Sequence, residues 1–170
     1  MKILTKNILL TLFIFNFHNV NAQTGMTFQT AEKQGIVLAE LDAIYKSAVS
    51  VDTTKAVFKT VEEQKKWGET YKSVIFDLGA FLKKNNFYWK QKTRCYNRIY
   101  FNENGKIDYF LYNFLGADEE KPNEKVQKEF DRLLNLFVKD YLLPININEK
   151  LAQCSPVTYM PQNELQTPQK

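Results

Sequence analysis

Histidine is nearly absent from this chain of 170 residues, and its single occurrence, His18, lies in an apolar N-terminal segment. If that segment is removed, no imidazole remains to act as a general base, to activate a serine or cysteine nucleophile, or to bind a metal. Two cysteines without histidine cannot complete the usual four-ligand zinc site. We therefore predict no metal and no cofactor, and we assign no catalytic residue.

The sequence also lacks an apolar run that could cross a membrane, since residues 8–17 supply about ten residues where a spanning helix needs ~20. Lys2 and Lys6 precede this run, and Val20 and Ala22 occupy the −3 and −1 positions of a signal-peptidase site. The pattern is typical of a secretory signal peptide, with an uncleaved anchor as the alternative. We expect cleavage after Ala22, a periplasmic or secreted protein, and no transmembrane segment in the mature chain.

Neither sign of charge dominates the predicted mature chain. Met1–Ala22 contains two lysines and no acidic residue, which leaves 21 basic and 19 acidic side chains and a formal charge of +2. This balance does not favour general electrostatic binding to nucleic acid or to an anionic membrane. The length suits a single domain over residues 23–160. Residues 23–28 are expected to form a flexible lead, and residues 161–170 a flexible tail.

Cysteine is scarce as well, with Cys95 and Cys154 as the only pair. An even number of cysteines in an exported protein favours a disulfide. In the chain-entropy model, a bond closing a loop of about 60 residues stabilises the fold by roughly 4 kcal/mol. We therefore predict a Cys95–Cys154 disulfide, with two buried free thiols as the alternative.

Two helices are expected in the first half of the domain. Apolar residues recur at helical spacing within residues 31–49, and again within residues 60–84. Thr60 begins the second helix with a capping-box sequence. Gly68 and Gly79 project in almost the same direction from this helix, which predicts the close approach of another element.

The apolar pattern then changes to a period of two. Residues 89–102 and 106–115 are predicted to form antiparallel strands joined by a tight turn with a glycine. An amphipathic helix is predicted over residues 123–142, followed by a last strand over residues 151–160, which Pro156 confines to an edge or bends. The order ααββαβ indicates an α+β fold, with a hairpin and a later strand packed on helices.

The hairpin carries the candidate binding surface. The register that we favour has a three-residue turn with a glycine bulge, which places Ile99 opposite Tyr109. One face of the hairpin is then both basic and aromatic. A two-residue turn would exchange these partners. Arginine and tyrosine are frequent interface hot spots. The candidate binding residues are Arg94, Tyr96, Arg98, Tyr100 and Tyr112.

Other interpretations of this face stay open. The helix predicted over residues 123–142 could cover the aromatic rings through Phe130, Leu134 and Phe137, while the basic ends reach solvent at its margin. Aromatic rings beside arginine and lysine also suit single-stranded nucleic acid. Export argues against that ligand, so no nucleic acid partner is expected.

The order of elements over residues 94–160 resembles the ββαβ unit that ends TonB-like energy transducers. Three runs carry the resemblance: Arg98-Ile99-Tyr100-Phe101, Asn104-Gly105-Lys106 and Leu142-Leu143-Pro144. The resemblance implies a related fold, and no functional residue of that family is carried over to this chain.

Two classes of function follow from these observations. The first is an exported, non-catalytic binding module that acts on a protein or cell-envelope partner, for example as a protective inhibitor. The second is a small envelope hydrolase that works through two carboxylates and needs no histidine. The acidic run at residues 118–120 is best explained as a solvated turn near a helix N-terminus, so no pair of acids is singled out.

Overall fold

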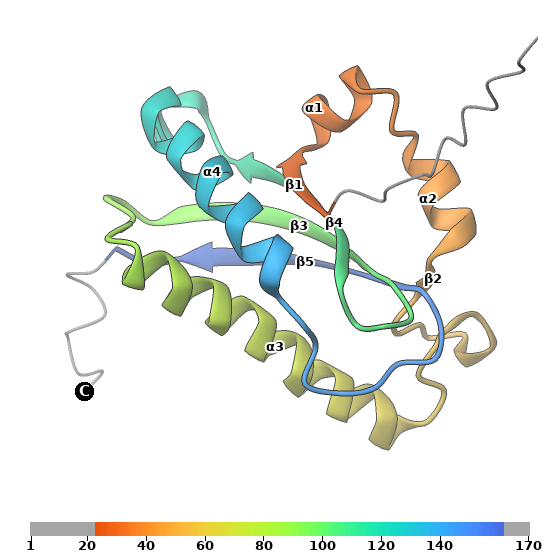
Figure 1. Ribbon diagram of the computed structural model, residues 1–170. Coiled ribbons are helices and arrows are strands. Elements are labelled where there is room, and N and C mark those ends of the chain that lie inside the picture. Colours follow the sequence, from red (N-terminus) through yellow and green to blue (C-terminus); the bar gives the residue numbers. More distant parts are fainter. Residues whose placement is uncertain (1–22, 162–170) are drawn as a thin grey trace, which may run out of the picture.

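A five-stranded mixed sheet forms the centre of the protein, with helices on both of its faces (Figure 1). The computed structural model describes residues 23–161, and the strand order is β1-β4-β3-β5-β2. The central strands β4, β3 and β5 are antiparallel, whereas the short outer strands β1 and β2 pair in parallel. In chain order the elements are β1 (Thr24–Thr27), α1 (Phe28–Lys33), α2 (Leu38–Ile44), β2 (Lys46–Ser47), a 3-10 turn (Thr53–Lys55), α3 (Val61–Lys84), β3 (Thr93–Phe101), β4 (Ile107–Leu115), a second 3-10 turn (Asp118–Glu120), α4 (Glu124–Asp140) and β5 (Leu151–Tyr159).

The predicted α+β class is confirmed, and local sequence explains where the two long helices begin. The Thr60 hydroxyl accepts a hydrogen bond from the Glu63 amide at 3.1 Å, and the Glu63 carboxylate accepts one from the Thr60 amide at 2.9 Å. This is the capping box that the sequence predicts for α3. At the start of α4, the Asn123 side chain accepts a bond from the Val126 amide at 3.1 Å.

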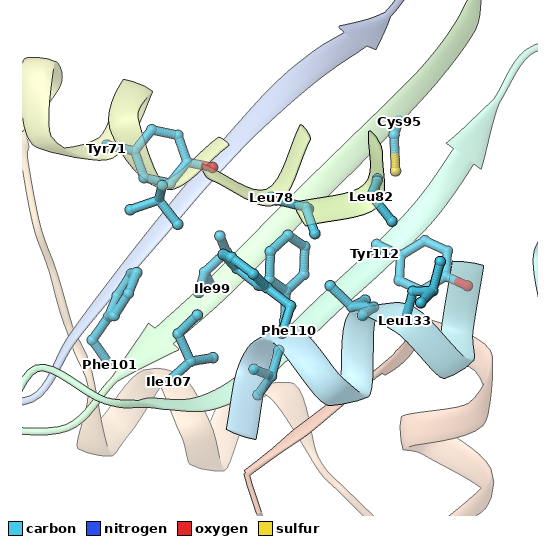
Figure 2. Close-up of a cluster of buried hydrophobic side chains, with 14 of the residues drawn as sticks. Tyr71, Leu78, Leu82, Cys95, Ile99, Phe101, Ile107, Phe110, Tyr112 and Leu133 are labelled. Carbon is cyan, nitrogen blue, oxygen red and sulfur yellow. The ribbon is translucent and has the colours of Figure 1, made fainter. Parts of the chain in front are cut away.

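The main core lies between the sheet and the helices α3 and α4 (Figure 2). Leu78 of α3 and Leu133 of α4 are fully buried against Ile99 and Phe110, which face each other on β3 and β4. Burial of each such side chain contributes roughly 1.5–3 kcal/mol relative to an exposed position. This layer therefore fixes α3 and α4 on one face of the sheet.

A second, smaller core lies on the opposite face, where α1 and α2 cover only part of the sheet (Figure 1). Met26, Leu41 and Tyr45 pack there against Tyr100 and Leu111 of the central strands. The Tyr45 hydroxyl also donates a 2.6 Å hydrogen bond to the buried carboxylate of Asp108. These contacts fasten the N-terminal segment to the sheet.

The N-terminal region differs from the prediction in two ways. Residues 23–28 are not a flexible lead, because residues 24–27 form strand β1 beside β4. The Asn135 side chain accepts a bond from the Gly25 amide at 3.0 Å and donates one to the Gly25 carbonyl at 2.7 Å. The single helix expected over residues 31–49 is two helices, since Gly35, at φ +77°, follows the end of α1.

The predicted signal peptide, residues 1–22, lies outside the described residues, as does the predicted tail beyond Pro161. Within residues 23–161, no helix has the length and apolar character needed to span a membrane.

Candidate binding groove

The hairpin register decides which of the predicted binding residues share a face. A bulge between Tyr100 and Phe101 pairs Ile99 with Phe110, and not with Tyr109 as the favoured register predicts. Because side chains alternate between faces, this shift of one residue exchanges the two faces of β4 relative to those of β3.

Tyr112 is consequently on the wrong face to join the predicted surface. It is 0% exposed beneath α4, where its ring meets the Phe130 ring edge-on at a centroid distance of 5.0 Å. Its hydroxyl donates a hydrogen bond to Asp131. Burial and this neighbouring carboxylate raise the pKa of Tyr112. Tyr112 is a core residue, and the prediction that it binds a partner at the surface is corrected.

Tyr100 lies on the predicted face, but helix α2 covers it. Its side chain is 0% exposed, and the Tyr45 ring packs edge-on against it at a centroid distance of 5.1 Å. The Tyr100 hydroxyl donates to Asp42 at 3.2 Å, and Arg98 forms an ion pair with the same carboxylate. Burial is the main cause of a raised Tyr100 pKa. A helix therefore covers this ring, as the alternative interpretation expected, but the helix is α2 and not the one predicted over residues 123–142.

Arg94 and Tyr96 lie at the other end of the same face, where Tyr96 meets only the margin of this second core. Arg94 is exposed and Tyr96 is partly exposed, with its ring 6.0 Å from that of Phe28. The hollow beside Arg98 measures about 180 Å³, below the roughly 300–1,000 Å³ of small-molecule sites. The five predicted residues do not form one accessible surface, and a binding role for Arg94 and Tyr96 stays a prediction.

The predicted disulfide is wrong, because both cysteines are free. Cys95 pairs with Val157, whereas Cys154 pairs with Arg98, three positions further along β3. An odd offset places the two side chains on opposite faces of the sheet. Cys154 is exposed, while burial raises the pKa of the Cys95 thiol to about 12.

An apolar groove of about 550 Å³ lies between α3 and the C-terminal half of β5. Its volume falls in the range of about 300–1,000 Å³ that is typical of ligand sites. Large apolar side chains stand exposed around it, with Phe76 at 75%, Tyr88 at 40% and Met160 at 36% exposure. The rest of the wall includes Ile75, Gly79, Lys83, Trp89, Val157 and Tyr159.

The sequence of α3 explains why this groove is open. Phe76 lies off the apolar stripe that α3 turns to the sheet, and Gly79 follows almost one helical turn later. A side-chain carbon built on Gly79 or on Gly68 meets no atom within 4 Å. The element expected to approach these glycines is therefore missing from residues 23–161. The signal in the sequence that could have indicated this site is an aromatic residue, Phe76, that lies off the buried stripe and three positions before a glycine.

Charge in the groove comes from one residue. Lys83 is the single charged side chain of its described wall, and that wall contains no acidic residue. Lys83 lies in the last turn of α3, followed by Lys84. The groove therefore combines apolar and aromatic walls with one positive charge at its margin.

The strand edge that leads to the groove is blocked at two positions. Strand β2 pairs only with Leu151 and Ala152 of β5. The Ala152 carbonyl accepts a hydrogen bond from the Ala48 amide on the β2 side of β5. Because backbone groups alternate in direction along a strand, those of Cys154 and Pro156 also point to this side. The Cys154 carbonyl there accepts the Gln153 side-chain amide at 2.9 Å, and Pro156 has no N–H. Such features protect an edge from strand addition.

The more buried carboxylates serve separate hydrogen-bond networks. Asp108 is 2% exposed and accepts bonds from Tyr45 and Asn102 near the hairpin turn. Asp131 of α4 accepts from Tyr112 further along β4. Within residues 23–161, no group of three or more histidine, cysteine, aspartate or glutamate side chains is placed to hold a metal ion.

Comparison with protein-family models, with curated proteins and with solved structures finds no match to this chain. The resemblance of residues 94–160 to the ββαβ unit of TonB-like energy transducers therefore stays a prediction.

Proposed function

We propose that this protein is an exported, non-catalytic binding module whose partner is a protein or a cell-envelope component. The binding site in this proposal is the groove between α3 and β5. A protective inhibitor of an exported enzyme is one specific form of such a module. The signal-peptide pattern of Met1–Ala22 supports the export part of the proposal.

One observation carries the binding part of the proposal. Nine large apolar side chains are exposed among the described residues, and three of them, Phe76, Tyr88 and Met160, line this one groove. Single exposed apolar residues are normal on a protein surface, whereas a contiguous patch marks an interaction site. Aromatic side chains and methionine are also enriched where proteins meet their partners.

The arrangement of acids favours binding over the hydrolase alternative. A carboxylate-dependent hydrolase places two acids about 5–10 Å apart in the cleft that holds its substrate. The groove wall has no acidic residue, and the buried Asp108 and the partly buried Asp131 already accept hydrogen bonds from tyrosines.

Site-specific photocrosslinking in the producing cells tests the proposal. A photoreactive phenylalanine analogue replaces Phe76 in one variant and Val61 in the control, because both positions lie on α3 and are 75% and 80% exposed. We expect a discrete adduct from position 76, none from position 61, and loss of the adduct when Gly79→Gln fills the groove. Equal labelling at both positions, or no adduct at either, would contradict the proposal.

A further inference from the structure

We infer that the ligand of the groove is a long-chain carboxylate, that is, the anion of a fatty acid. Its alkyl chain lies along the apolar wall, and its carboxylate meets Lys83. This inference rests on the proposed function, namely that the groove is a binding site, and it adds the chemical class of the ligand.

The walls of the groove match an alkyl chain. Phe76, Tyr88 and Met160 offer exposed apolar surface along it, and the buried rings of Trp89 and Tyr159, stacked at 4.8 Å, form part of the wall. Apolar walls of this kind gain free energy from each methylene removed from water, and full burial of one methylene raises affinity about fourfold. In an open groove, where burial is partial, we expect about twofold to fourfold.

The charge of the groove matches a single anionic group. Lys83 is the one charged side chain of the wall, and no acidic residue of the wall neutralises it. A fatty-acid anion also carries one charge, at one end of an apolar body. An ion pair at the margin of the groove, partly covered by the alkyl chain, changes the affinity about fivefold, which is the upper end of the range for exposed ion pairs.

The edge of β5 offers an extended peptide an incomplete set of backbone hydrogen-bond partners. A peptide in a groove beside a strand gains affinity chiefly by pairing its backbone with that strand. Here Pro156 lacks a donor, and the Gln153 side chain occupies the carbonyl of Cys154. An alkyl chain needs no hydrogen bonds, so this edge does not penalise it.

Isothermal titration of the mature chain with dodecanoate and with dodecanol tests the inference. Both probes are used as monomers at pH 7.5, where the carboxylate is ionised. We expect dodecanoate to bind about fivefold more tightly than dodecanol, and affinity to rise with each methylene from decanoate to tetradecanoate. Lys83→Gln should remove the preference for dodecanoate, whereas the control Lys84→Gln, which changes the next residue outside the wall, should keep it.

Two glycine variants separate groove binding from adsorption elsewhere. Both Gly79 and Gly68 are helical glycines with free space above them, but only Gly79 lines the groove. Gly79→Gln should therefore weaken both probes at least tenfold, and Gly68→Gln should leave both unchanged.

Several results would overturn the inference. These are equal affinity for the two probes, binding that Gly79→Gln does not affect, or dimerisation of the chain through the groove, which would assign the groove to a second copy. Crosslinking at position 76 without dodecanoate binding would refute the fatty-acid assignment and leave the proposed binding function intact. Absence of both would refute both.

Discussion

A methyl group at position 25 should loosen the attachment of β1, because no space is left for it. A carbon added to Gly25 would lie 2.6 Å from Cγ and 2.8 Å from Cδ2 of Leu134. Leu134 is 0% exposed within the main core, so it cannot turn into solvent. Asn135 holds both backbone groups of Gly25, which prevents the strand from sliding away. Overpacking of this kind costs about 1–3 kcal/mol, and we expect Gly25→Ala to lower the free energy of unfolding by about 2 kcal/mol.

Urea denaturation followed by tryptophan fluorescence measures this change, and a double-mutant cycle isolates its cause. Leu134→Ala alone should cost about 2–5 kcal/mol, because it leaves a cavity. In the double variant the new methyl enters that cavity, so the combined loss should be smaller than the sum by at least about 1 kcal/mol. Gly68→Ala is the control: its added carbon meets no atom within 4 Å, and helix propensity predicts stabilisation of up to about 1 kcal/mol. Additive losses within about 0.5 kcal/mol would refute the steric explanation.

Three further predictions concern buried polar groups. Tyr45→Phe removes a 2.6 Å bond to the buried carboxylate of Asp108, and the free energy of unfolding in urea should fall by about 1.5–3 kcal/mol; no loss would show that solvent replaces the hydroxyl. Titration with a thiol reagent should modify Cys154 rapidly and Cys95 only on unfolding, because burial raises the pKa of the Cys95 thiol to about 12; two rapid reactions would contradict the described burial. Desolvation raises the pKa of Asp131 above its ordinary 3.8, so the folded state binds this proton more tightly than the unfolded state does. The free energy of unfolding should therefore fall as the pH rises from about 4 through the raised pKa. Asp131→Asn should remove that part of the pH dependence, and an unchanged profile in urea titrations between pH 3 and 7 would argue against a raised pKa.

Local signals in the sequence were sufficient to predict the long helices and the hairpin. The capping box at Thr60 and the asparagine cap at Asn123 are satisfied within a few residues of chain, so no tertiary information is needed to identify them. The alternation in β3 likewise identifies its buried face, since Ile99 and Phe101 point into the main core. These elements account for most of the α+β architecture.

The details that decide the site depend on single-residue choices that the sequence leaves open. One bulge beside Tyr100 moves Tyr112 to the opposite face. The offset between β3 and β5 separates Cys95 from Cys154. Strand β1 has only four residues and forms through contacts with distant partners, among them Asn135. The groove was missed because the prediction for α3 considered the apolar stripe and the two glycines, and not Phe76, which lies off that stripe and is 75% exposed.

The attachment of the N-terminal segment has a consequence for how the chain folds. Thr24 pairs with Tyr109, 85 positions later, and Lys46 pairs with Leu151, 105 positions later. Contacts over such separations pay loop-closure entropy before any local structure offsets it, and we expect them to form late. We therefore expect residues 24–47 to dock onto a unit already built from α3, the hairpin, α4 and β5. A segment that joins last through a few contacts also opens first, at a lower free energy than global unfolding. Each such opening would expose Tyr100, and we expect it to make the basic and aromatic face of the hairpin accessible in a minor population.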